Sequence, residues 1–183
     1  MPSPEEPRNG RPAVFLDRDG TIMRDADYCG DPGQVKVFEG VGEALRQLKK
    51  AGFRICIITN QSGIGRGYFS EQDYRAVEAE VARQVGAGLI DDTYFCPDLP
   101  DNGSKRRKPA AGMIFEAQRD HAIDLAGSFM VGDKLIDVEC GKNAGVRTIL
   151  VHTGNERQDA ASGADWEASD LTEAAKIILR HAL

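Results

Sequence analysis

A short apolar stretch that ends in two acids constrains the fold of this chain more than any other feature. Residues 13–21 read A-V-F-L-D-R-D-G-T, so four apolar residues run directly into Asp17, Arg18 and Asp19 and then into a D-G turn. This pattern predicts a buried strand that ends at a turn. Because side chains of an extended chain alternate between faces, we expect Asp17 and Asp19 to point one way and Arg18 the other. The two carboxylates would then share one small site.

Two carboxylates so close together need a counter-charge. Like charges raise each other's pKa unless a cation lies between them, so the pair predicts either a hard divalent metal or a shared proton. Mg²⁺ is the simplest candidate. The same letters would also suit a helix-capping aspartate followed by an ordinary turn, and residues further along the chain distinguish these alternatives.

The length and composition predict one soluble domain. The 183 residues are 41% hydrophobic, enough for one well-buried core and too few for two ordinary domains. We expect residues 1–12 to form a disordered lead and residues 13–183 to form a single domain. A net charge of -6 predicts no nucleic-acid or anionic-membrane partner. The four cysteines are scattered and contain no C-x-x-C, which indicates reduced thiols and a cytoplasmic location.

Strands and helices are predicted to alternate along the chain. Short apolar runs predict strands, and amphipathic spacing between them predicts helices. The expected strands are 13–16, 54–59, 92–97, 128–131 and 148–151, with a short edge strand near Trp166, and the expected helices are 40–51, 70–85, one opening at Pro109, 136–144 and 171–181. This alternation is typical of an α/β sandwich around a mostly parallel sheet, whose ligands bind outside the carboxyl ends of the strands.

Polar side chains follow several of these strands. Thr59 and Asn60 come at the end of the second strand, Asp133 follows the fourth, and Lys108 precedes the helix after the third. Separate segments thus bring acids, a hydroxyl and an ammonium to one edge of the sheet. Each residue alone has an ordinary explanation, such as a helix cap or a solvated loop. Their combination is far more specific.

With these residues in view, the chain resembles the haloacid dehalogenase superfamily of magnesium-dependent phosphotransferases. The resemblance rests on the D-x-D-G-T, Thr, Lys and G-D-x-x-x-D signatures and covers nearly the whole chain. It implies a Rossmann-like three-layer fold in which Asp17 is the nucleophile and Asp19 the acid and base. It also implies that Asp17, the backbone carbonyl of Asp19 and Asp133 hold Mg²⁺, and that Asp137 positions Lys108 or a metal-bound water.

Phosphoryl transfer suits these side chains. Charge develops on three equatorial oxygens of the phosphoryl group, so the site needs cations and fixed donors. Mg²⁺, Lys108, the Thr59 hydroxyl and nearby backbone N–H groups would supply them. A covalent aspartyl phosphate would split hydrolysis into two easier steps, with Asp19 acting as an acid and then as a base.

Four strings narrow the resemblance. F-L-D-R-D-G-T-I, T-N-Q-S-G-I-G-R-G-Y-F, R-K-P and V-G-D-K-x-x-D are similar to the branch that contains heptose-bisphosphate and histidinol-phosphate phosphatases. This implies that the substrate is a small phosphorylated metabolite. The preferred candidate is a heptose bisphosphate of a lipopolysaccharide or S-layer precursor pathway, and the alternative is histidinol phosphate or another monophosphate. It also implies substrate contacts from Asn60, Gln61, Ser62, Arg107 and Lys108, with Arg107 gripping a second phosphate or hydroxyls.

The chain departs from this branch at one place. Members usually carry a structural zinc loop before the R-K-P, made of Cys-x-His and two further cysteines, whereas here Cys96 is alone. Because three of the four ligands are missing, we predict no zinc. The short connections leave no room for a large cap domain, so we expect an open site and a monomer.

Two alternatives belong to other classes of protein. A receiver-type phosphoacceptor domain also gathers acids, Thr and Lys around Mg²⁺ in a doubly wound sheet. It keeps its phosphorylated aspartate on a middle strand and is shorter, whereas this chain has a second acid placed to activate water. The other alternative is a degenerate binding module, although no catalytic position of the motif is lost here.

Overall fold

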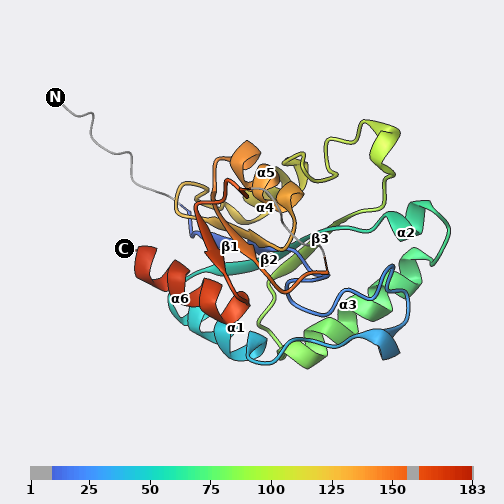
Figure 1. Cartoon of the computed structure of the whole chain (residues 1–183), viewed down its shortest axis with the longest axis horizontal. Coiled ribbons are helices and arrows are strands. Elements are labelled where there is room, and N and C mark those ends of the chain that lie inside the picture. The colour runs from blue at the N-terminus through green and yellow to red at the C-terminus, as the bar shows by residue number, and fades with distance from the viewer. Residues whose placement is uncertain (1–9, 156–160, 183) are drawn as a thin grey trace.

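The computed structural model of the protein describes residues 10–155 and 161–182. Within them six strands form one sheet, and every neighbouring pair is parallel. The strands are β1 (Ala13–Leu16), β2 (Arg54–Asn60), β3 (Asp92–Cys96), β4 (Phe129–Gly132), β5 (Arg147–Val151) and β6 (Trp166–Ala168). Their order is β3-β2-β1-β4-β5-β6, so the chain changes its direction across the sheet at β1 and β4 (Figure 1). Ligands of such sheets bind outside the carboxyl ends of the strands at this point.

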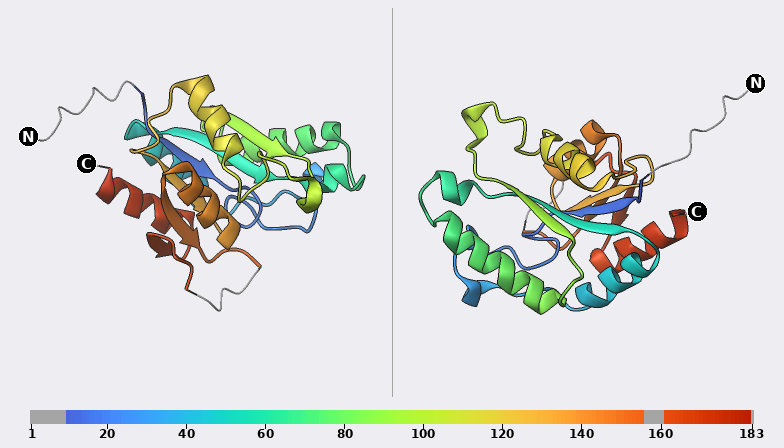
Figure 2. Two further views of the ribbon diagram at one scale, coloured as in Figure 1. Left: turned by 90° about the horizontal axis from the view of Figure 1, so that it is seen from above. Right: turned by 180° about the vertical axis from the view of Figure 1, so that it is seen from behind.

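Helices cover both faces of the sheet (Figure 2). They are α1 (Val41–Lys50), α2 (Ser62–Gly65), α3 (Glu71–Val85), α4 (Gly112–His121), α5 (Leu135–Ala144) and α6 (Leu171–His181), with short 3-10 turns η1 (Pro32–Gln34) and η2 (Pro100–Asn102). Helices α1, α3 and α6 pack on one face, and α4 and α5 pack on the other. The predicted α/β sandwich around a parallel sheet is therefore confirmed.

Strand β1 joins the two halves of the core. Val14 and Leu16 belong to the cluster that contains buried residues of α1, α3 and α6, whereas Ala13 and Phe15 belong to the cluster with α4 and α5. All four side chains are fully buried, as expected for a parallel strand that is covered on both faces. Packing from both sides fixes the end of β1, and with it the start of the segment that carries the two acids.

The helix predicted to open at Pro109 begins three residues later, at Gly112. The Ala110 N–H donates to the Arg107 carbonyl at 2.9 Å, and the Gly112 N–H donates to the Lys105 carbonyl at 3.0 Å. These bonds close a compact turn ahead of α4, which the periodicity of the sequence does not reveal. The short helix α2, in a Gly-rich segment, is a second element that the sequence did not predict.

The predicted disordered lead is only partly covered by the structure, because residues 1–9 lie outside the described residues. Residues 10–12 belong to the fold instead. Arg11 forms a parallel β-bridge with Ile123, and the Pro12 carbonyl accepts a hydrogen bond from the Arg54 N–H at 2.9 Å. None of the helices in the described ranges combines the length and the apolar character needed to cross a membrane.

Candidate active site

A buried ammonium group lies at the centre of the site. Lys108 Nζ donates to Oδ1 of Asp17 and to Oδ1 of Asp137, both at 2.7 Å, and to the Ile58 carbonyl at 2.9 Å. Burial by itself would lower the pKa of Lys108, but the charges of Asp137 and Asp17 outweigh it and raise the pKa above its ordinary value. Lys108 therefore stays charged and links the end of β1 to the start of α5.

Three buried acids form a cluster, two of which, Asp17 and Asp137, bind this ammonium. One oxygen from each of Asp17, Asp133 and Asp137 lies within 4.8 Å of the others, and this is the only such group of possible metal ligands among the described residues. Burial, together with the charges of Asp17 and Asp137, raises the pKa of Asp133 to about 8. Burial also raises the pKa of Asp17, against the opposing charge of Lys108. The three carboxylates are hard oxygen ligands of the kind that Mg²⁺ prefers, and one ammonium does not neutralise all of their charge.

Asp133 is held by residues of two distant loops. The Thr21 hydroxyl donates to Oδ1 of Asp133 at 3.2 Å. Gly20 and Gly154 lie so close to this carboxylate that a Cβ atom on either would overlap it, and the Thr153 hydroxyl ties the two loops together by donating to the Gly20 carbonyl at 2.6 Å. The D-G-T motif gave a signal for Gly20 and Thr21, whereas nothing in the sequence indicated Gly154.

The Asp19 carboxylate does not join the cluster of Asp17, Asp133 and Asp137, although the motif predicted that the carboxylates of Asp17 and Asp19 would lie together. Its carboxylate accepts two hydrogen bonds from Arg18, both at 3.1 Å, and one from Gln61 Nε2 at 2.9 Å. The alternation rule fails here because β1 ends at Leu16, so residues 17–19 are no longer part of a regular strand. For the same reason Arg18 does not turn away from the acids but pairs with one of them. The carboxylate partners of Asp17 are Asp133 and Asp137.

The end of β2 supplies a second set of polar groups. The Asn60 side chain forms two hydrogen bonds with the backbone of Lys108, at 3.0 and 3.1 Å, and so fixes the lysine. Gln61 Nε2 donates to the Thr59 hydroxyl at 2.8 Å as well as to Asp19. Asn60 and Gln61 therefore hold other site residues, an arrangement that the sequence did not predict.

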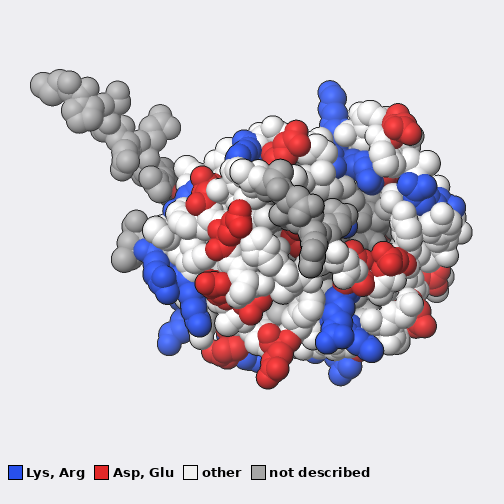
Figure 3. All heavy atoms as spheres, viewed as in Figure 1, with Lys and Arg blue, Asp and Glu red and all other residues white. Residues whose placement is uncertain are grey.

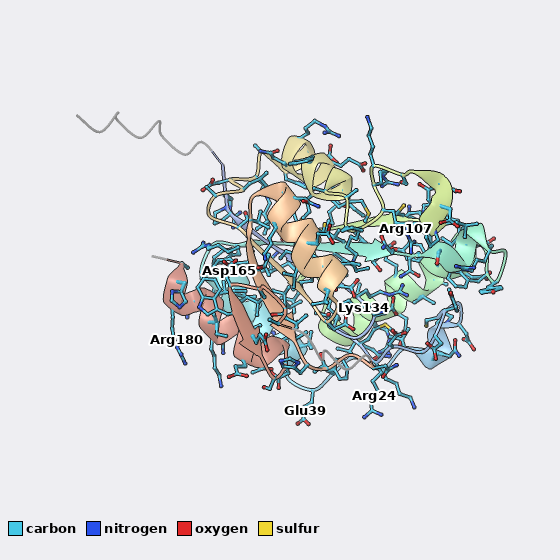
Figure 4. The ribbon with its side chains drawn as sticks, turned by 45° about the horizontal axis from the view of Figure 1, so that its top comes forward. Arg24, Glu39, Arg107, Lys134, Asp165 and Arg180 are labelled. Carbon is cyan, nitrogen blue, oxygen red and sulfur yellow. The ribbon has the colours of Figure 1, made fainter. Side chains whose placement is uncertain are left out.

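A hollow of about 270 Å³ opens beside Asp19. Among the residues predicted from the sequence, its wall contains Asp19, Asn60, Gln61, Ser62 and Arg107, and it also contains Asp25, Asp27, Tyr28, Cys29, Gly63, Lys134 and Ile136. Arg107 and Lys134 reach it from the loop before α4 and from the start of α5 (Figure 4). Acidic and basic side chains are intermixed on the face seen in Figure 3. This face therefore has no broad positive patch, and an anionic ligand in the hollow would meet positive charge only from the basic side chains of its wall.

Side-chain bonds hold the loop that carries Arg107. Arg106 donates to both side-chain oxygens of Glu116, at 2.7 and 3.1 Å. The Ser104 hydroxyl accepts hydrogen bonds from the backbone N–H groups of Arg106 and Arg107. Arg107 Nη1 donates to the Asp98 carbonyl at 2.9 Å. Cys96, the lone cysteine ahead of this loop, is buried and bonds to Asp98 and Ser104. The absence of zinc stays a prediction.

Comparison with known proteins gives consistent results. Residues 105–174, which include Lys108, Asp133 and Asp137, match a family model described as HAD-hydrolase-like. The D-glycero-β-D-manno-heptose-1,7-bisphosphate 7-phosphatase of Haemophilus ducreyi is 43% identical over 156 residues, which cover 79% of this chain and 85% of that protein. The enzyme of the same name from Escherichia coli K12 is 38% identical, over 88% of this chain and 91% of that protein.

Solved structures of similar fold carry related names. The D,D-heptose 1,7-bisphosphate phosphatase of B. bronchiseptica, complexed with magnesium and phosphate, superposes with a TM-score of 0.84 at 32% identity. The match covers 93% of this chain and 99% of that chain. The corresponding phosphatase of Burkholderia thailandensis gives a TM-score of 0.68 at 28% identity, over 92% of this chain and 99% of that one.

Proposed function

Because the chain belongs to the haloacid dehalogenase-like hydrolases, within the family of heptose bisphosphate phosphatases, we propose that it hydrolyses the 7-phosphate of D-glycero-D-manno-heptose 1,7-bisphosphate. The observation that carries the chemistry is the Asp17 carboxylate, which lies directly after β1 and is held by the buried Lys108 at 2.7 Å. A carboxylate fixed in this way can act as a nucleophile toward phosphorus. Membership of this family sets aside the receiver-type and binding-module alternatives.

In the proposed reaction an oxygen of Asp17 forms a bond to phosphorus while the bond from phosphorus to the sugar oxygen breaks. Asp19, in the wall of the hollow, gives a proton to the departing oxygen and later takes one from the water that hydrolyses the aspartyl phosphate. Lys108 and the Thr59 hydroxyl stabilise charge on the phosphoryl oxygens. Asp19 keeps its proposed role without belonging to the acid cluster of Asp17, Asp133 and Asp137, because it acts on the leaving group and on water.

We propose that Asp17, Asp133 and the backbone carbonyl of Asp19 hold Mg²⁺, with Asp137 acting mainly through Lys108. The grouping of the three acids within 4.8 Å and the raised pKa of Asp133 support this assignment, because both indicate negative charge in excess of what Lys108 neutralises. When bound, Mg²⁺ would offset the negative charge of the acids and of the phosphoryl oxygens.

The hollow supports a sugar bisphosphate as substrate. Asn60, Gln61 and Ser62 would contact the substrate from the end of β2, and the two cations of the wall, Arg107 and Lys134, suit a second phosphate. Carboxylates are the usual acceptors for sugar hydroxyls, and Asp25 and Asp27 are in the same wall. The wall of the hollow thus combines cations for a phosphate with carboxylates for the hydroxyls of a sugar.

We also propose a monomeric and cytoplasmic enzyme. Every residue in the proposed reaction comes from one chain, so the proposed chemistry needs no second copy. All four cysteines are buried free thiols, and burial raises the pKa of Cys56 and of Cys140 to about 12, as is common for proteins of a reducing compartment.

The test is phosphate release with Mg²⁺ from both anomers of the heptose bisphosphate, from fructose 1,6-bisphosphate and from histidinol phosphate. We expect kcat/KM for one heptose anomer to exceed the other compounds by about a hundredfold, or about 2.7 kcal/mol of transition-state discrimination. Comparable weak activity on every compound would contradict the proposed substrate while leaving the phosphatase chemistry intact. No release from any of them would contradict both.

A further inference from the structure

Arg18 is an almost fully buried arginine that none of the proposed chemical steps uses. Arg18 is 1% exposed, and its guanidinium lies 5.6 Å from the centre of the buried Tyr74 ring. A buried charge costs free energy unless it is paired and hydrogen-bonded. An apolar side chain of similar length would fill this position at lower cost, since Ile57 and Val81 line the same region. Packing alone therefore does not explain why this position is an arginine.

The hydrogen bonds of this guanidinium supply that reason. Within the part of the chain that the structure describes, Nη1 has no partner, and every bond of the guanidinium goes to Asp19 or Gln61. Nε and Nη2 donate to the two oxygens of Asp19 at 3.1 Å, and Nη2 also donates to Oε1 of Gln61 at 3.3 Å. Planar two-point binding of a carboxylate fixes both its position and its plane.

Gln61 completes a cradle around the same carboxylate. Its Nε2 donates to Oδ2 of Asp19 at 2.9 Å and to the Thr59 hydroxyl at 2.8 Å. The Asp19 carboxylate thus accepts hydrogen bonds from three nitrogen atoms, while its side chain stays 20% exposed and Asp19 lies in the wall of the hollow. Proton transfer requires donor and acceptor to be placed within a few tenths of an ångström.

We propose that Arg18 is a positioning residue that orients the Asp19 carboxylate toward the leaving group, with Gln61 as its helper. The inference rests on the proposed function, because it concerns the proton transfer assigned to Asp19. The Arg18 guanidinium contacts neither the phosphoryl group nor the carboxylates of Asp17 and Asp133 in this scheme. Its contribution is therefore specific to the two proton transfers of Asp19, and the first of these matters only when the departing oxygen needs a proton.

The experiment compares two kinds of leaving group in the full-length enzyme with Mg²⁺. In the Arg18→Met variant we expect kcat for a sugar phosphate to fall by about a hundredfold, the lower end of the usual contribution of general acid–base catalysis, with little change in KM. Nitrophenolate leaves without needing a proton, so the initial burst from nitrophenyl phosphate should keep its rate. The slower turnover that follows the burst depends on Asp19 as a base and should fall. Arg18→Lys should recover part of the loss.

Arg75→Met is the matched control. Arg75 lies at the same 5.6 Å from the Tyr74 ring, but it is half exposed and pairs with Glu71 and Glu78. It should behave as the unmodified enzyme. In Arg18→Met, a burst rate from nitrophenyl phosphate that falls as much as kcat on the sugar phosphate, or an unchanged kcat on the sugar phosphate, would overturn the inference. If the unmodified enzyme rejects heptose bisphosphates, the proposed substrate fails, but the comparison can still be made on any alkyl phosphate it hydrolyses.

Discussion

Lys108 Nζ lies 2.7 Å from Oδ1 of Asp17, although 91 residues separate them in the chain. Asp17 directly follows β1, and Lys108 lies in the loop before α4, whose backbone the Asn60 side chain binds at Lys108. Charge-assisted hydrogen bonds of this length hold a carboxylate in one orientation. The pair therefore joins the proposed nucleophile to a fixed positive charge, and separate predictions concern each partner.

Replacing the nucleophile should stop turnover. In Asp17→Asn the amide has nearly the shape of the carboxylate but is no nucleophile, so we expect kcat to fall by roughly 10⁴-fold or more. Mass spectrometry after a rapid acid quench should show a phosphorylated species in the unmodified protein and none in the variant. The exposed Asp101 offers a control, Asp101→Asn, that should change neither. Near-normal hydrolysis by Asp17→Asn would contradict the assignment of Asp17 as the nucleophile.

Removing the buried ammonium should affect both activity and stability. In Lys108→Met we expect kcat to fall by about 10²–10³-fold, as when one preorganised donor is lost. Without Mg²⁺ the free energy of unfolding should drop by about 3 kcal/mol, because the three buried acids lose their counter-charge, and Mg²⁺ should restore part of it. Urea unfolding with and without Mg²⁺ measures this. Lys105→Met, in the exposed part of the same loop, is the control, and equal unfolding free energies for the two variants would contradict the prediction.

Binding of Mg²⁺ should weaken as the pH falls. Because burial and neighbouring acids raise the pKa of Asp133 to about 8, the metal-free site holds a proton below that pH, and Mg²⁺ must displace it. We expect the dissociation constant to rise by up to about tenfold for each pH unit below about 8. Isothermal titration calorimetry in buffers of different ionisation enthalpy measures both the affinity and the proton released.

The raised pKa of Asp133 also determines how the stability of the metal-free protein changes with pH. The folded protein binds the Asp133 proton more tightly than the unfolded chain, whose carboxyl keeps its ordinary value of 3.8. The free energy of unfolding should therefore rise as the pH falls from about 8 toward 4, by up to about 1.4 kcal/mol per unit from this group. Asp133→Asn should remove this dependence, and a variant that keeps it would show that another group is responsible.

A methyl group at Gly154 should disturb the proposed metal site from outside. The added Cβ atom would overlap the Asp133 carboxylate, so we expect Gly154→Ala to weaken Mg²⁺ binding by about tenfold or more, as when a group that orients a metal ligand is lost. Gly33→Ala is the control, since its Cβ would meet nothing nearer than 3.2 Å. Calorimetric titration of both variants decides the question, and equal affinities would show that the loop yields freely.

The sequence predicted the sheet and the residues that directly follow its strands. Buried parallel strands are short apolar runs, so their ends are marked by the first polar residue. Asp17, Thr59 and Asp133 were found in this way, and their shared edge of the sheet followed from the predicted topology. Lys108 was placed at the same edge from its position before the helix that follows the third strand, but its burial was not predicted, because a lysine in a basic loop has no local signal that it is buried.

Contacts that depend on the local path of the chain could not be predicted. The end of β1 at Leu16 was predicted correctly, but Arg18 and Asp19 follow that end, where side chains no longer alternate between two faces as in a strand. The approach of Gly154 to Asp133 joins loops that lie far apart in sequence, and no spacing reports it. The start of α4 at Gly112 depends on a backbone turn that carries no periodic pattern.

Arg107 should distinguish substrates with two phosphates from those with one. Its guanidinium lines the hollow and is held by the Asp98 carbonyl at 2.9 Å, so it presents a fixed cation to the part of the substrate that does not react. Loss of a charge-assisted hydrogen bond costs about 1.5–3 kcal/mol, so Arg107→Ala should lower kcat/KM for a bisphosphate by about tenfold to a hundredfold. A monophosphate of the same sugar should lose much less, and Lys105→Ala should lose nothing on either. Steady-state kinetics on the two sugars measures the difference, and equal losses would mean that Arg107 supports the loop rather than binding a second phosphate.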